Sequence, residues 1–115
     1  QIRMAAEGTE LLNNVVEQSK IEGMLVGGAS GVTISIIGNK AKGNGGSGIG
    51  VFGPGFKAKV EQNECFTNGE YGIAFVEGAG GSIRDNTCKG NNLGSISNIG
   101  AAPDLLIEGN FTDAK

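Results

Sequence analysis

The sequence contains no histidine and no tryptophan, and only one tyrosine, two prolines and two cysteines occur among its 115 residues. Without histidine, the chain lacks the side chain that most often serves as a general base or a metal ligand near neutral pH. Without tryptophan, it has few of the aromatic rings that polysaccharide-degrading enzymes use to hold sugars. These absences favour a protein that is not an enzyme, and we predict no metal and no cofactor.

Concentrated positive charge and long apolar runs are missing as well. The nine basic residues are scattered along the chain and the formal net charge is −3, whereas a nucleic-acid-binding surface gathers lysine and arginine. No segment approaches the roughly 20 apolar residues that span a bilayer. We therefore predict no nucleic-acid partner and no membrane partner, and the sequence assigns no localisation.

Glycine, by contrast, is abundant, with 22 residues. Each glycine inside a helix costs about 1 kcal/mol relative to alanine, so the chain is poorly suited to helices. Its apolar content of 38% is nevertheless too high for a disordered glycine-rich linker. We expect an all-β protein made of short strands and turns.

A repeat of 23 to 25 residues runs through the chain. It is marked by five asparagines: Asn14, Asn39, Asn63, Asn86 and Asn110. An aliphatic residue stands three positions before each of them: Leu11, Ile36, Val60, Ile83 and Ile107. This period suits one coil of a parallel β-helix, in which equivalent residues stack about 4.8 Å apart. Residues 1–115 are expected to form one domain of four to five coils, either complete or part of a longer solenoid.

The stretch GNGGSGIGVFGPG, residues 43–55, contains two overlapping matches to the G-x-G-x-x-G pattern of phosphate-binding loops. Such a loop occurs once and opens a helix, whereas Gly48 and Gly72 hold the same place in consecutive repeats. Pro54 and Gly55 follow in place of a helix. We interpret these glycines as a turn that recurs from coil to coil.

The segment GIGVFGPGFKAKVEQNECFTNGEYGIAFVEGAGGSIRDNTCKGN, residues 48–91, resembles the right-handed parallel β-helix repeats of the pectin-lyase-like superfamily. The resemblance extends over nearly the whole chain and implies a right-handed, single-stranded parallel β-helix. This superfamily includes polysaccharide lyases, glycoside hydrolases and epimerases, and also non-catalytic repeat proteins. No catalytic motif of these enzymes is matched, so the resemblance implies the fold and leaves the function open.

Two columns of the repeat have structural explanations. Stacked asparagines hydrogen-bond to one another and tolerate sharp corners, so we expect a structural ladder of Asn14, Asn39, Asn63, Asn86 and Asn110. Cys65 and Cys88 stand two positions after consecutive asparagines, and we expect both to be buried, unreactive thiols. We expect Phe52, Phe56 and Phe75 to fill the core.

One outward column is a candidate ligand-binding surface. Two positions before each asparagine stand Leu12, Ile37, Glu61, Arg84 and Glu108. Its charged part, with Lys59, offers groups that could bind an acidic polysaccharide, so the candidate ligand-binding residues are Lys59, Glu61, Arg84 and Glu108. The alternative is a set of surface ion pairs worth about 0.2–1 kcal/mol each.

The ends of a stack of coils present unpaired strand edges, which natural proteins cover with a cap or another subunit. No amphipathic helix is evident at either end, and Leu12, Ile37 and Leu106 fall in outward columns. We expect a binding or structural module that associates with itself or with adjoining coils of a longer chain. The competing hypothesis is a carbohydrate-active domain that binds or modifies an acidic polysaccharide.

Overall fold

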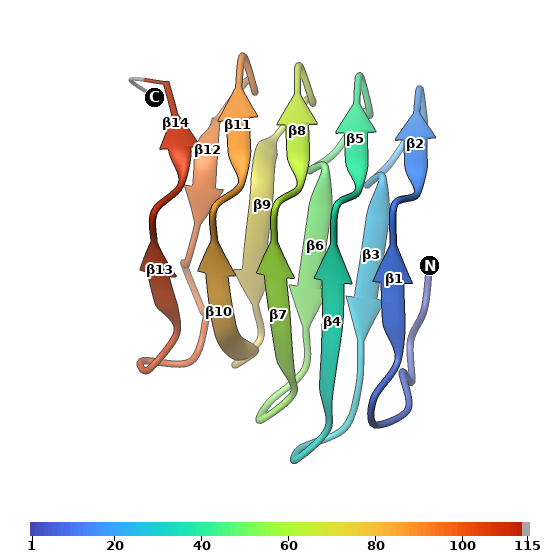
Figure 1. The fold of residues 1–115 in the computed structure, drawn as a ribbon, viewed down its shortest axis with the longest axis vertical. Helices are drawn as coiled ribbons and strands as arrows, with labels where there is room; N and C mark the ends of the chain where they lie inside the picture. Colours follow the sequence, from blue (N-terminus) through green and yellow to red (C-terminus); the bar gives the residue numbers. More distant parts are fainter. Residues whose placement is uncertain (114–115) are drawn as a thin grey trace.

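The computed structural model describes residues 1–113, which form strands and turns without a helix. The strands make three sheets in which every pair of neighbours is parallel, and the chain passes from sheet to sheet as it winds into a stack of coils (Figure 1). The predicted all-β solenoid is therefore confirmed. Since no helix is present in this range, none that could span a membrane is found there.

Each sheet collects one strand from successive coils. Sheet I contains β1 (Glu10–Leu12), β4 (Thr33–Ile37), β7 (Lys57–Glu61), β10 (Gly80–Arg84) and β13 (Leu106–Glu108). Sheet II contains β2 (Val15–Glu17), β5 (Lys40–Lys42), β8 (Glu64–Phe66), β11 (Thr87–Lys89) and β14 (Phe111–Thr112). Sheet III contains β3 (Met24–Gly27), β6 (Ile49–Phe52), β9 (Tyr71–Val76) and β12 (Gly94–Ser97).

The register of the strands matches the repeat in the sequence. In sheet I, Ile36 pairs with Leu11 on one side and with Val60 on the other. Because side chains alternate between the two faces of a strand, the aliphatic column three positions before each asparagine points inward throughout. Ile36, Val60 and Ile83 are completely buried.

The core is a narrow column between the three sheets, and each coil contributes a few apolar side chains to it. Phe56 and Phe75 are fully buried, as predicted. Phe52 is not in the core: it is half-buried on the outer face of sheet III, with its ring over Gly27. The physical reason is alternation, because Val51 takes the inward position between Val26 and Phe75 and so turns the next residue outward.

The turn between sheets I and II is a sharp corner with a left-handed residue before each ladder asparagine. Asn13, Gln62 and Asp85 have φ of 54°, 56° and 55°, and glycines fill the same place in the other two coils. A left-handed residue lets the chain bend sharply within one position. This corner places the following asparagine inside the coil.

The recurring glycine of the GNGGSGIG stretch is required by close packing. A Cβ atom at Gly48 would lie 2.8 Å from Asn68 Nδ2 and 2.8 Å from the carbonyl oxygen of Gly72. A Cβ atom at Gly72 would lie 2.9 Å from Asn91 Nδ2 and 2.8 Å from the carbonyl oxygen of Ser95. These glycines let the backbone approach a buried asparagine, which supports their interpretation as a structural turn.

Candidate functional site

The structure places the five predicted asparagines in one hydrogen-bonded ladder. Each of them, from Asn14 to Asn86, donates from its backbone N–H and from Nδ2 to Oδ1 of the asparagine in the following coil, over 2.8–3.0 Å. The second hydrogen on Nδ2 is donated to a backbone carbonyl of the preceding coil, as from Asn63 to Ile36 at 2.9 Å. The amides of Asn39, Asn63 and Asn86 are buried with these partners, so their role is structural.

A second ladder runs parallel to the first at the next corner. Asn44 donates to Asn68 Oδ1, and Asn68 donates to Asn91 Oδ1, again through the backbone N–H and Nδ2. Ser19 begins this ladder by donating its backbone N–H to Asn44 Oδ1. Its signal in the sequence is the recurrence of these residues five positions after the first ladder, although recurrence alone does not reveal the hydrogen bonds.

Cys65 and Cys88 are adjacent, fully buried free thiols in the core. The side-chain hydrogen bond with Cys88, followed by burial, raises the pKa of Cys65 well above the ordinary value for a thiol. A thiol is nucleophilic only as the thiolate, so this environment suppresses reactivity. Within residues 1–113, no group of three or more His, Cys, Asp or Glu residues is arranged to hold a metal ion.

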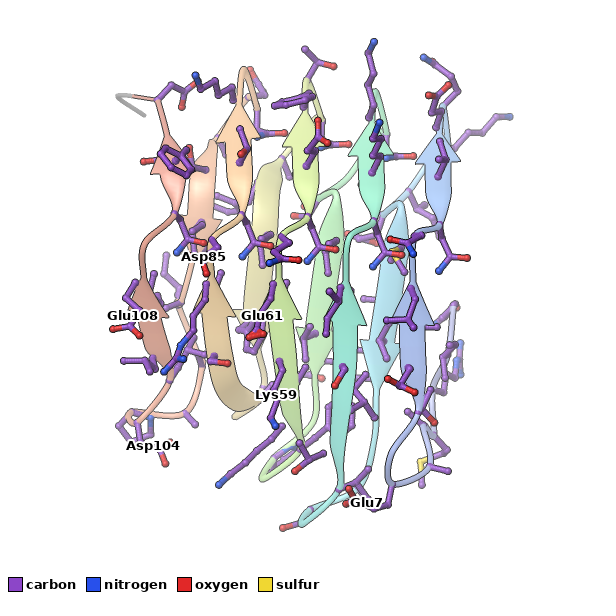
Figure 2. The ribbon with its side chains drawn as sticks, viewed as in Figure 1. Glu7, Lys59, Glu61, Asp85, Asp104 and Glu108 are labelled. Atoms are coloured by element: carbon purple, nitrogen blue, oxygen red, sulfur yellow. The ribbon has the colours of Figure 1, made fainter. Side chains whose placement is uncertain are left out.

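The four candidate ligand-binding residues all lie on the outer face of sheet I. Figure 2 labels three of them, Lys59, Glu61 and Glu108. Glu61 pairs in register with Arg84, and Arg84 with Glu108. Lys59 lies in the neighbouring outward column, in register with Ser82. These four residues therefore place two cations and two carboxylates side by side on the face.

Arg84 already has an anionic partner on this face. Its Nε lies 3.1 Å from Glu108 Oε1, with side chains 43% and 55% exposed. The contact lacks the geometry of a hydrogen bond, since Arg84 Nε has no hydrogen-bond partner, so we describe it as an ionic contact. At such exposure the pair contributes about 0–1 kcal/mol, and Glu108 competes with any anionic ligand for Arg84.

Sequence reasoning missed a shallow groove of about 300 Å³ on the outer face of sheet III. Gly50, Ala74 and Ser97 form its floor because they pair in register and carry small side chains. Glu22 and Glu70 are among the lining residues, so the groove does not suit a negatively charged sugar. The alternation of Ile49, Val51, Ile73 and Phe75 in the sequence was the signal that could have found it.

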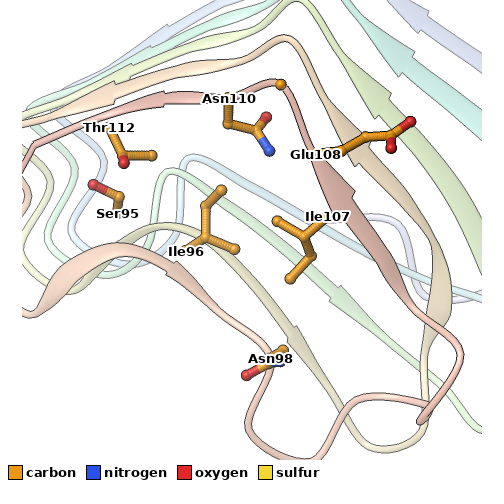
Figure 3. Close-up of a pocket in the computed structure, with 8 residues that line it drawn as sticks. Ser95, Ile96, Asn98, Ile107, Glu108, Asn110 and Thr112 are labelled. Atoms are coloured by element: carbon orange, nitrogen blue, oxygen red, sulfur yellow. The ribbon is translucent and has the colours of Figure 1, made fainter.

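The C-terminal coil leaves its inward side open to solvent. Ile107 continues the buried column of Ile83, yet Ile107 is 39% exposed and Ile83 is 0% exposed. With Ile96, Asn110 and Thr112 it lines a hollow of about 450 Å³ at this end (Figure 3). In the middle of the stack, the next coil covers these positions.

The N-terminal coil has a corresponding hollow of about 300 Å³, which Leu11, Asn14 and Val16 help to line. Among residues 1–113, all the exposed large apolar side chains except Val76 lie at the two ends of the stack. They are Met4, Leu12, Val15, Ile21, Leu93, Ile99, Leu106, Ile107 and Phe111. The two end faces therefore concentrate the uncovered apolar surface.

A family model for the right-handed beta helix region matches residues 3–112. The chain belongs to the right-handed β-helix family. The match confirms the predicted handedness, and it identifies a fold without assigning an activity to this β-helix. Searches among curated proteins and among solved structures found no match.

Proposed function

We propose that this β-helix is a non-catalytic structural module that associates with itself through the ends of its stack of coils. The observation that carries the proposal is Ile107, which is 39% exposed in a column whose members Ile36, Val60 and Ile83 are all at 0%. The last coil thus ends with core residues facing solvent and with an unpaired strand edge.

Both features favour association. Covering apolar surface contributes about 25 cal/mol per Å², and an unpaired parallel edge offers a row of backbone donors and acceptors to another strand. A repeat array normally has polar capping repeats at its ends. Here the exposed apolar residues gather at the ends, in the reverse of that arrangement.

Sedimentation velocity over a wide range of protein concentration tests the proposal. We expect the wild-type chain to sediment faster as concentration rises, and Phe111→Lys, at a position 66% exposed in the last coil, to weaken this association. Val76→Lys is the matched control, because Val76 is exposed in the middle of the stack. A wild-type chain that stays monomeric at every concentration would contradict the proposal.

A second candidate function is the binding of an acidic polysaccharide to the outer face of sheet I. Lys57 and Lys59 support it, since both are exposed on β7 and, among residues 1–113, neither has an ion-pair partner. Titration with polygalacturonate or alginate tests it, with a neutral glucan as the control ligand. We expect Lys59→Ala and Arg84→Ala each to weaken binding, and binding that is equal in both variants and wild type would exclude this face.

A further inference from the structure

We propose that the partner at the C-terminal end is the N-terminal end of a second copy, so that copies stack head to tail in an open chain. This inference rests on the proposed self-association and specifies its geometry. The two ends lie at opposite sides of the stack (Figure 1), so each copy can use both of them at once.

The asparagine ladder gives the stack a direction. Between successive asparagine side chains every rung donates toward the C-terminal coil, from the N–H and Nδ2 of one asparagine to Oδ1 of the next, so Asn110 accepts from Asn86 at 3.0 Å. The backbone bonds beside the ladder run the other way, as from the Lys40 N–H to the Asn14 carbonyl at 2.8 Å. Among the described residues, the Asn110 backbone N–H has no partner, and Asn14 Oδ1 accepts no hydrogen bond. In this side-chain series the last rung thus keeps free donors and the first rung keeps a free acceptor.

This polarity selects among the possible pairings. Two C-terminal ends facing each other would leave the ladder donors of Asn110 without an Oδ1 acceptor, and two N-terminal ends would leave Asn14 Oδ1 without a ladder donor. A C-terminal end on an N-terminal end places the Asn110 N–H and Nδ2 opposite Asn14 Oδ1, which continues the ladder across the junction. An unpaired buried donor or acceptor destabilises an interface, so the head-to-tail pairing is favoured.

The apolar side chains at the ends of two columns agree with the same pairing. Val15, Lys40, Glu64, Thr87 and Phe111 succeed one another in one outward column of sheet II. A head-to-tail junction extends this column from Phe111 to Val15 of the next copy, and these side chains are 66% and 62% exposed in the single chain. In the inward column of sheet I, Ile107 would meet Leu11 in the same way.

Parallel in-register stacking also keeps both strand edges paired in the manner of the sheets within each copy. A pairing of like ends would bring the strands together antiparallel and lose this register. Because the two contact surfaces of a head-to-tail junction differ, the assembly does not close after two copies. The expected product is a series of increasing length.

Two variants, each blocked at one end, test the inference. The N-blocked variant carries Leu12→Lys and Val15→Lys, and the C-blocked variant carries Ile107→Lys and Phe111→Lys, since lysine at a strand edge opposes pairing. Circular dichroism and thermal unfolding verify their folding. If a double variant unfolds, Val15→Lys or Phe111→Lys replaces it, because both sites are more than half exposed.

Head-to-tail stacking predicts that each blocked variant is a monomer alone and that an equimolar mixture forms one-to-one dimers and nothing larger. A monomeric mixture would overturn the inference. So would self-association of either blocked variant alone, which would indicate pairing of like ends or contact through another surface while leaving self-association intact. A monomeric wild type would instead refute the proposed function itself, and would point to adjoining coils of a longer chain as the cover.

Discussion

At the scale of single residues, several non-glycine residues at the corners of the coils adopt a left-handed backbone conformation that costs free energy. Thr67 has φ of 54° in a place where the adjacent coils have Gly43 and Gly90. A left-handed conformation costs an L-residue about 1–2 kcal/mol, and a β-branched side chain makes it worse. The requirement for this conformation is therefore met by strain in one coil and by glycine in its neighbours.

Replacing Thr67 by glycine should relieve this strain. We expect Thr67→Gly to raise the free energy of unfolding by about 0.5–1 kcal/mol, after allowing for the greater chain entropy of glycine and the loss of the exposed hydroxyl hydrogen bond. Urea denaturation measures the change. The reverse substitution Gly90→Ala, at φ of 68°, should lower stability by about 1 kcal/mol, and a stabilising effect there would contradict the explanation.

The buried thiol pair makes stability sensitive to alkaline pH. The pKa of Cys65 in the folded protein lies well above its ordinary value, chiefly through the hydrogen bond with Cys88 and burial. The pKa of a thiol in the unfolded chain is about 8.5. The folded state therefore holds its proton more tightly, so this stability is fully present below about pH 8.5 and declines as the pH rises from there toward the folded pKa.

We expect the free energy of unfolding to fall between pH 7 and pH 10, and to fall less steeply in Cys65→Ala. Urea titrations at a series of pH values measure both slopes. Titrating groups outside the thiol pair are common to the two proteins, so the difference between the slopes reports the contribution that depends on Cys65 and its contact with Cys88. Equal slopes would show that this thiol does not contribute.

At the scale of secondary-structure elements, the asparagine ladder ties each coil to both neighbours. Asn63 accepts two hydrogen bonds from Asn39 and donates to Ile36 and Asn86. Asn63→Ala leaves several of these buried groups unpaired, each at about 1–3 kcal/mol, and should cost about 3 kcal/mol or more. Asn14→Ala, whose side chain only donates to Asn39, should cost about 1 kcal/mol. Thermal and urea unfolding measure the two losses, and equal losses would contradict the ladder's role.

Much of this element-level arrangement could be predicted from the sequence, because asparagines and aliphatic residues recur with a period that fixes the register. The position of Phe52 was predicted wrongly, since a phenylalanine next to Val51 does not reveal which of the two points inward. The groove on sheet III was missed because the outward orientation of Gly50 and Ala74 follows only from the alternation of the large residues on either side of them. Candidate residues on sheet I were placed on one face by the register, but their ligand remains a prediction.

At the scale of the whole molecule, the stack should open from its ends. Each coil contacts its immediate neighbours, so a terminal coil packs against one coil whereas a central coil packs against two. We expect amide hydrogen exchange in dilute solution to be slowest in β7 and β10 and fastest in β1, β2, β13 and β14. At high protein concentration, the terminal strands should gain protection while the central ones change little. Uniform protection throughout would indicate a single cooperative unit.

The position of the two cysteines has a practical consequence for observing this opening. Cys65 and Cys88 lie in neighbouring coils in the interior and are completely buried, so a thiol-modifying reagent reaches them only after the surrounding coils separate. The rate of labelling at Cys65 therefore reports how often the centre of the protein opens, without any probe having to be introduced. Cys88 lies one coil from the C-terminal end and pairs with Thr112 of β14, so fraying of that strand uncovers Cys88 while Cys65 stays buried.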